Sequence, residues 1–155
     1  MAGPGRQNSL VIRERREGDD AAIRRVVDAA FGRPAEFRLV EALRAANLAA
    51  VELVATRGEE IVGHLLMSAL SVFIDDQPVP SLALAPLSVR PQQQGQGVGT
   101  ALMEVGLDVA RARQWDAIVV LGDPEYYARF GFTTEAAEHL ESPYSGESFL
   151  ALELV

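Results

Sequence analysis

A long amphipathic segment between two apolar runs constrains the fold of this chain more than any other feature. Apolar residues recur at helical spacing within residues 97–113, at Val98, Ala101, Leu102, Val105 and Val109. Residues 82–89 and 117–121 flank this segment as strand-like runs. The second run lacks polar alternation, as in a strand buried on both faces of a parallel sheet. The pattern predicts a right-handed strand–helix–strand crossover.

The rest of the chain predicts further elements that complete one domain. Strand-like runs cover residues 10–13, 51–56, 61–73 and 149–155, and helical patterns cover residues 20–31, 34–47 and 124–129. Their order predicts a mixed α+β domain of the α/β class. Its central sheet should have six to seven strands, antiparallel in the first half and with the parallel crossover in the second. We expect residues 1–9 to form a flexible leader and residues 10–155 a single domain.

Three glycines alternate with other residues where the fourth expected strand turns into the long helix. The segment reads Gln94-Gly95-Gln96-Gly97-Val98-Gly99-Thr100. Glycine permits positive φ and leaves no Cβ to obstruct a ligand, so backbone N–H groups can converge on an anion at the helix N-terminus. The dinucleotide fingerprint G-x-G-x-x-G does not fit, because Thr100 stands three residues after Gly97. The segment indicates a phosphate or pyrophosphate site, although glycines that merely allow close packing stay an alternative.

Pro86 lies inside the fourth expected strand. Proline removes one donor from a strand ladder and is tolerated at sheet edges or bulges. A bulge here would separate the fourth and fifth strands, and the free backbone groups of residues 87–89 could then pair with an extended amide-bearing ligand. The alternative is an edge proline without a functional consequence.

Composition excludes several kinds of chemistry. All 14 basic residues are arginine, so mechanisms that need a lysine are absent, and the chain has no cysteine for a disulfide, thiol nucleophile or thiolate metal site. Two histidines, His64 and His139, are too few for a three-histidine metal centre. A net charge of −8 argues against nucleic-acid binding. Without an apolar run of membrane-spanning length, we expect no membrane contact and a cytoplasmic location.

Two separated motifs resemble the GNAT superfamily of N-acetyltransferases. The first is Val89-Arg90-Pro91 followed by the glycine segment, and the second is Tyr127-Ala128-Arg129-Phe130-Gly131-Phe132. The segment Leu121-Gly122-Asp123-Pro124-Glu125-Tyr126-Tyr127 is similar to small bacterial members of that family. The likeness is clearest over residues 82–132. It implies a GNAT-like domain in which strands 4 and 5 splay into a V.

The resemblance also implies a cosubstrate and its binding residues. The donor would be acetyl-coenzyme A, with no metal involved. Its pyrophosphate and pantetheine would be bound by Leu87, Ser88, Val89, Gln94, Gly95, Gln96, Gly97, Val98, Gly99 and Thr100. Tyr127 occupies the position at which the family protonates the leaving thiolate, whereas neighbouring Tyr126 is expected to be structural. Arg90 or Arg129 could assist at the phosphate.

The implied reaction is direct attack by a primary amine of a small molecule, peptide or protein on the thioester, within a ternary complex. A non-catalytic acyl-coenzyme A-binding module, acting as a sensor or interaction domain, is the main alternative, and a domain that binds another phosphate metabolite is a third. No residue stands out as general base among Glu36, His64, Asp75, Asp76 and the acidic segment 135–141. Residues 149–155 could pair with a second copy of the chain as an edge strand, so a homodimer is possible.

Overall fold

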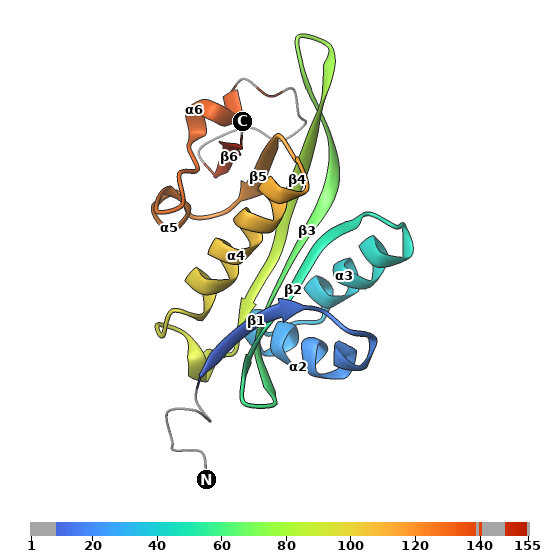
Figure 1. Ribbon diagram of the computed structural model, residues 1–155, viewed down its shortest axis with the longest axis vertical. Helices are drawn as coiled ribbons and strands as arrows, with labels where there is room; N and C mark the ends of the chain where they lie inside the picture. Colours follow the sequence, from blue (N-terminus) through green and yellow to red (C-terminus); the bar gives the residue numbers. More distant parts are fainter. Residues whose placement is uncertain (1–8, 139, 141–147, 155) are drawn as a thin grey trace.

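A six-stranded sheet forms the centre of the computed structural model, which describes residues 9–138, 140 and 148–154 (Figure 1). The strands lie in chain order across the sheet: β1 (Leu10–Glu14), β2 (Ala49–Arg57), β3 (Glu60–Ile74), β4 (Gln77–Val89), β5 (Ala117–Leu121) and β6 (Phe149–Glu153). Neighbouring strands are antiparallel except for β4 and β5, which are parallel. This confirms the predicted mixed sheet with its parallel crossover. The expected leader lies outside the described residues, apart from Ser9.

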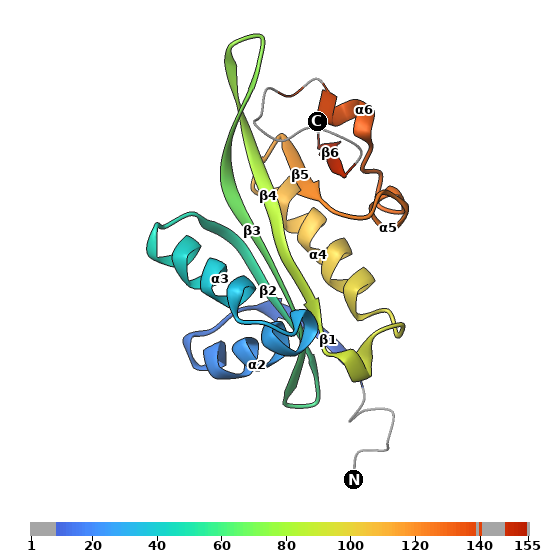
Figure 2. The ribbon, with the colours of Figure 1, turned by 180° about the vertical axis from the view of Figure 1, so that it is seen from behind.

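Helices cover both faces of the sheet. On one face lie α2 (Asp20–Phe31) and α3 (Ala35–Ala45), and on the other lies α4 (Val98–Ala112), as Figures 1 and 2 show from opposite sides. Each face has its own apolar core: Leu102 and Met103 of α4 pack against Leu65 and Met67 of β3, while Val27 of α2 packs against the opposite face. No helix of the described residues is long and apolar enough to cross a membrane.

The structure differs from the sequence-based expectation in two segments. The strand expected from residue 82 begins at Gln77, so β3 and β4 form a long hairpin that extends beyond the rest of the sheet (Figure 1). Two prolines, Pro78 and Pro80, are tolerated there because β5 pairs with β4 only from Ser81 onward. Within the polar segment after Phe132, the structure has a short helix, α6 (Thr134–Glu138), which is too short for a helical period to be recognised.

The strands β4 and β5 separate after a short common stretch. They pair at Ser81–Ala117, Leu82–Ile118 and Ala83–Val119, after which β4 continues along β3 to Val89 without a described partner on its other side. A register shift against β3 falls between Leu84 and Leu87, where β4 has one more residue than β3. Pro86 falls within this shift, which agrees with a bulge and not with an ordinary edge proline, and the gap between β4 and β5 opens there.

Candidate functional site

The glycine segment forms a loop that ends at the first turn of α4. Gly95 has φ 76° and Gly97, the N-cap of α4, has φ 84°, a left-handed conformation that glycine adopts without a steric penalty. Ala101 N–H donates to the carbonyl of Gly97 at 3.0 Å, so the N–H groups before it begin the helix without intrahelical acceptors. No side chain caps this terminus. The loop thus presents free donors at the positive end of the helix dipole.

Gly99 serves a different purpose from the two glycines before it. It lies inside the first turn of α4, and a Cβ at this position would come within 2.8 Å of the Tyr126 hydroxyl. A Cβ at Gly95 or Gly97 would meet no atom within 4 Å. Gly99 therefore makes room for an aromatic side chain, whereas Gly95 and Gly97 set the backbone path and leave space above it.

A cavity of about 380 Å³ opens above this loop, and we call it the glycine pocket. Beyond the loop itself, it is lined by Val89, Gln93, Tyr126 and Arg129. Arg129 is the only charged side chain among the described residues that line it. The Arg129 guanidinium lies 4.5 Å from the centroid of the Tyr126 ring. Burial raises the pKa of the Tyr126 hydroxyl, and the Arg129 charge partly offsets this.

Tyr126 and Arg129 reach the pocket from α5 (Pro124–Ala128) and the residue after it. Asp123 starts this helix by accepting the Glu125 N–H at 3.0 Å, and the Tyr126 hydroxyl lies against Gly99 of α4. Tyr126, which the sequence analysis expects to be structural, lines the pocket as well. Of the two arginines considered for the phosphate, Arg129 lies at the pocket, and Arg90 instead pairs with Glu60.

Along β4, the backbone N–H and C=O groups of successive residues point alternately toward β3 and into the gap. Arg90 N–H donates to the Val62 carbonyl at 2.9 Å, so Arg90 and, two residues earlier, Ser88 turn their backbone groups toward β3. Leu87 and Val89 therefore direct theirs into the gap. The Val89 carbonyl already accepts a hydrogen bond from the Gln94 side chain at 3.1 Å. The hydroxyl of Ser88 is buried on the face that carries α2, away from the glycine pocket.

Tyr127 lies beside the β5 wall of the gap. Its ring packs over Gly122, directly after β5, where a Cβ would come within 2.5 Å of the ring, and it contacts Phe132 edge-on at 5.8 Å between centroids. Burial, and to a smaller degree the neighbouring Tyr126, raises the pKa of Tyr127 to about 12. Its phenol is therefore protonated throughout the physiological pH range.

A second cavity, of about 360 Å³, lies on the face of the sheet that carries α3, and we call it the apolar cavity. Its walls come from α3, β3, β4, β5 and β6. They include Ala83, Leu84 and Ala85 of β4 and Val119, Val120 and Leu121 of β5. These residues include the last paired residues of the two strands and those just beyond, so this cavity lies where the gap begins.

None of the candidate general bases that the structure describes lines either cavity. Glu36 pairs with Arg33 at 2.6 Å, and Asp75 and Asp76 form the turn at the tip of the β3–β4 hairpin. Of the acidic segment 135–141, residues 139 and 141 lie outside the described residues. No group of three His, Asp or Glu side chains among the described residues is placed to hold a metal ion.

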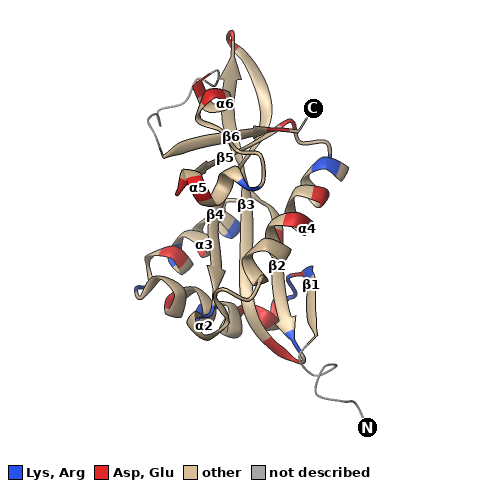
Figure 3. Ribbon diagram, turned by 90° about the vertical axis from the view of Figure 1, so that its left-hand side faces the viewer, with Lys and Arg blue, Asp and Glu red and all other residues tan. Residues whose placement is uncertain are grey.

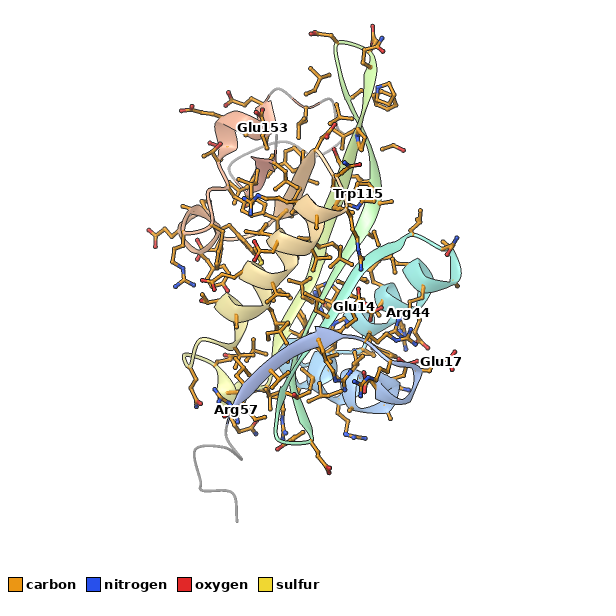
Figure 4. All side chains as sticks on the ribbon, viewed as in Figure 1. Glu14, Glu17, Arg44, Arg57, Trp115 and Glu153 are labelled. Carbon is orange, nitrogen blue, oxygen red and sulfur yellow. The ribbon has the colours of Figure 1, made fainter. Side chains whose placement is uncertain are left out.

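His64, the remaining candidate, belongs to a buried ionic cluster behind β2 and β3. Its Nε2 lies 2.7 Å from Oε2 of Glu52, which also accepts hydrogen bonds from Arg44 at 2.6 and 3.1 Å. Burial raises the pKa of Glu52, but the hydrogen bonds from His64 and Arg44 outweigh this and bring it to about 2. Arg44 of this cluster, from α3, is labelled in Figure 4.

These features define a class of fold: a mixed α/β domain with a gap between two parallel strands and, at the mouth of the gap, a helix terminus with free N–H donors. A family model described as an acetyltransferase (GNAT) domain matches residues 11–134. The uncharacterized N-acetyltransferase YhbS of Escherichia coli strain K12 is 35% identical over 130 residues, which cover 83% of this chain and 74% of that protein.

Two solved structures agree with this match. The crystal structure of YhbS from Escherichia coli in complex with CoA has a TM-score of 0.83 and 30% identity, covering 94% of this chain and 82% of that chain. A GNAT family acetyltransferase from Brucella melitensis in complex with acetyl-CoA has a TM-score of 0.79 and 34% identity, covering 94% of this chain and 88% of that chain. The chain belongs to the GNAT acetyltransferase family, and N-acetyltransferase is the activity that this membership supports.

Proposed function

We propose that this chain transfers the acetyl group of acetyl-coenzyme A to a primary amine by direct attack in a ternary complex. The observation that carries the proposal is the gap between β4 and β5, with the glycine pocket at its open end, in a GNAT domain. The amine nitrogen forms a bond to the thioester carbonyl carbon, the C–S bond breaks, and the proton released by the amine balances the one taken up by the thiolate. The chain has no cysteine or lysine to carry the acetyl group, which favours direct attack.

In this proposal, coenzyme A binds mainly to the backbone. The free N–H groups of residues 95–100 bind the pyrophosphate, and Arg129 adds the positive charge at the pocket. The backbone groups of Val89 and the carbonyl of Leu87 pair with the pantetheine amides, for which the Gln94 side chain must release the Val89 carbonyl, and the Leu87 N–H is left for the thioester carbonyl. Ser88 contributes its position in the strand but no free polar group on this side. From Val89 to Leu84 the strand rises about 17 Å, which carries the thioester toward the closed end of the gap.

Tyr127 is the proposed donor to the leaving thiolate. A pKa of about 12 against about 8.5 for a thiol makes complete proton transfer unfavourable by about 5 kcal/mol. Tyr127 therefore acts by donating a hydrogen bond to the sulfur as negative charge develops, and the thiolate takes its final proton from water or from the attacking amine. An outward N–H of β4, that of Leu87, is the proposed donor to the oxyanion.

Titration calorimetry with acetyl-coenzyme A, followed by measurement of thiol release with a panel of amines, tests the proposal. We expect binding and amine-dependent thiol release together. Binding without release for any amine would favour the alternative, an acyl-coenzyme A-binding module that acts as a sensor or interaction domain. Absence of binding would reject both. Four expectations stay predictions: the cytoplasmic location, the leader, the single-domain extent of residues 10–155 and the homodimer. The homodimer would pair through β6 at the sheet edge, and a bridge between Thr133 and Ala151 partly covers the outer side of that strand.

A further inference from the structure

The apolar cavity opens through the sheet. Along an intact strand, alternate side chains point to opposite faces, so a cavity on one face meets every second residue. Here three consecutive residues of β4, Ala83 to Ala85, and three of β5, Val119 to Leu121, line the same cavity. Leu84 and Val120 belong to the apolar core on the α4 face of the sheet. Both nevertheless line the apolar cavity, whose wall on the opposite face includes Leu39 and Leu43 of α3. The closed end of the gap is therefore accessible from the face opposite α4.

The walls of this cavity are apolar and uncharged. The only polar side chain among the described residues that line it is that of Ser68. Neither β4 nor β5 carries a charged residue, as the tan ribbon of these strands shows in Figure 3. At the rim, the side chains of Leu39 and Leu121 are 42% and 57% exposed, so the apolar surface continues outward to solvent. Such a lining disfavours a second charge on any ligand that enters.

We propose that the apolar cavity binds the acceptor, and that the acceptor is a small amine with an apolar body and no charge other than that of the reacting ammonium, which becomes neutral on entering. This inference rests on the proposed function, because only a thioester delivered to the closed end of the gap gives the cavity a reacting partner. The continuity between cavity and gap places the nitrogen of such an amine toward the thioester and its hydrocarbon against Leu39, Leu43 and Leu121. A volume of about 360 Å³ suits a small molecule.

The same lining explains how the amine becomes a nucleophile without a carboxylate at the site. An alkylammonium loses its proton more readily when it leaves water for apolar surroundings, because burial penalises the charged form. No Asp or Glu among the described residues lines the cavity. The cavity thus favours the neutral amine, and the released proton passes to water at the rim.

Two amines of equal length test the charge requirement. Hexylamine and 1,6-diaminohexane present the same chain and the same reacting group, and they differ by one terminal ammonium. With acetyl-coenzyme A saturating, we expect kcat/KM for hexylamine to exceed that for the diamine at least tenfold. Equal values, or a preference for the diamine, would overturn the proposal.

A rim variant and a matched control test the location. Leu121→Gln should raise KM for hexylamine about tenfold with little change in kcat or in KM for acetyl-coenzyme A. Leu48→Gln changes a leucine that is 40% exposed and lines neither cavity, and it should leave all three values unchanged. Both side chains are exposed, so neither change should prevent folding. If KM for hexylamine is unaffected by Leu121→Gln, the cavity is not the acceptor site.

Two further measurements separate failure of this inference from failure of the proposed function. Calorimetry of hexylamine against the complex with coenzyme A reports binding without chemistry. Binding weakened by Leu121→Gln but without turnover would retain the cavity and reject the catalytic proposal. No binding of hexylamine, with turnover of other amines, would reject the cavity and retain the catalysis. Analytical ultracentrifugation tests whether a second copy of the chain occupies the cavity instead. If Leu121→Gln dissociates a dimer and leaves the KM for hexylamine unchanged, a second copy covers the cavity and the proposal is wrong.

Discussion

The two ends of the gap between β4 and β5 are built in opposite ways. The glycine pocket is formed largely by one contiguous segment, residues 93–100, and the polar groups that we propose for binding are backbone N–H donors and Arg129. The apolar cavity draws side chains from five separate elements and offers almost no polar group. The glycine pocket suits a charged ligand whose structure does not vary, because a short sequence motif specifies its geometry. The apolar cavity depends on side chains that can vary without disturbing the fold, so it is the end at which specificity can change.

The largest expected effect follows from disturbing the backbone of the glycine loop. Gly97→Val places a β-branched residue at φ 84° and puts a side chain into space that is open above the loop. We expect the Kd for acetyl-coenzyme A, measured by calorimetry, to rise at least 100-fold.

A glycine with the same conformation elsewhere provides the control. Gly32, at the end of α2, has φ 69° and open space around it, so Gly32→Val should cost about 1–2 kcal/mol of unfolding free energy without affecting the Kd. Wild-type affinity in Gly97→Val, with both variants folded by circular dichroism, would reject the glycine loop as the coenzyme site.

The adjacent tyrosines separate chemistry from coenzyme binding. Tyr127→Phe removes a hydrogen bond to the developing thiolate, so we expect kcat to fall about 10- to 100-fold with the KM for acetyl-coenzyme A within twofold. Tyr126→Phe removes the hydroxyl over Gly99 and should alter that KM a few-fold while kcat stays within twofold. If Tyr126→Phe lowered kcat and Tyr127→Phe changed only the KM, Tyr126 would be the donor to the thiolate and Tyr127 the residue that contributes to coenzyme binding.

The raised pKa of Tyr127 gives the same assignment a pH test. A phenol whose pKa is raised loses its proton only at higher pH, so the donor stays intact as pH increases from 7 to beyond 10. In steady-state rates across this range, no loss of kcat due to Tyr127 is expected below about pH 11. A decline centred near pH 10 that disappears in Tyr127→Phe would show a phenol with an ordinary pKa.

Much of the geometry of the glycine pocket could be predicted from the sequence, because its determinants are local; its role as the coenzyme site stays a prediction. The crossover, the loop glycines and Pro86 each act on the backbone within a few residues, and the gap lies where the proline predicts a bulge. The apolar cavity could not be predicted. Leu39 and Leu121 are far apart in sequence, and an apolar residue that lines a cavity has the same pattern as one that fills a core.

Tyr126 and α6 were missed for related physical reasons. Five-residue helices such as α5 and α6 contain too few residues to show which face is buried, so the direction of the Tyr126 side chain depended on its packing with Gly99. The position of Gly99 could have indicated this packing, because a residue inside the first turn of a helix does not need the backbone freedom of glycine. Its small size then indicates a close neighbour.

A smaller effect is expected from the single positive charge in the glycine pocket. Arg129→Gln should raise the Kd for acetyl-coenzyme A about fivefold at low ionic strength, because a partly exposed charge contributes about 1 kcal/mol to binding a phosphate. The difference should shrink as salt is added. Arg111→Gln, near the far end of α4, is the matched control and should leave the Kd unchanged. A salt-independent loss would mean that Arg129 acts through its stacking on Tyr126 instead of its charge.

The smallest effect on either end of the gap is expected from the ionic cluster around Glu52, because Glu52, Arg44 and His64 line neither cavity. Because the folded state lowers the pKa of Glu52 to about 2 from 4.5, its contribution to stability is complete above about pH 4.5 and is lost as pH falls toward 2. Glu52→Gln should cost about 3 kcal/mol at pH 7, since it leaves Arg44 and His64 without their shared carboxylate, and should flatten this acid-induced loss in denaturant titrations. Glu36→Gln, which breaks the partly exposed pair with Arg33, should cost about 1 kcal/mol or less. If Glu52→Gln weakened acetyl-coenzyme A binding at pH 7 while the protein stayed folded, the ionic cluster would be coupled to the gap. The glycine pocket and the apolar cavity could then no longer be treated as independent of this part of the sheet.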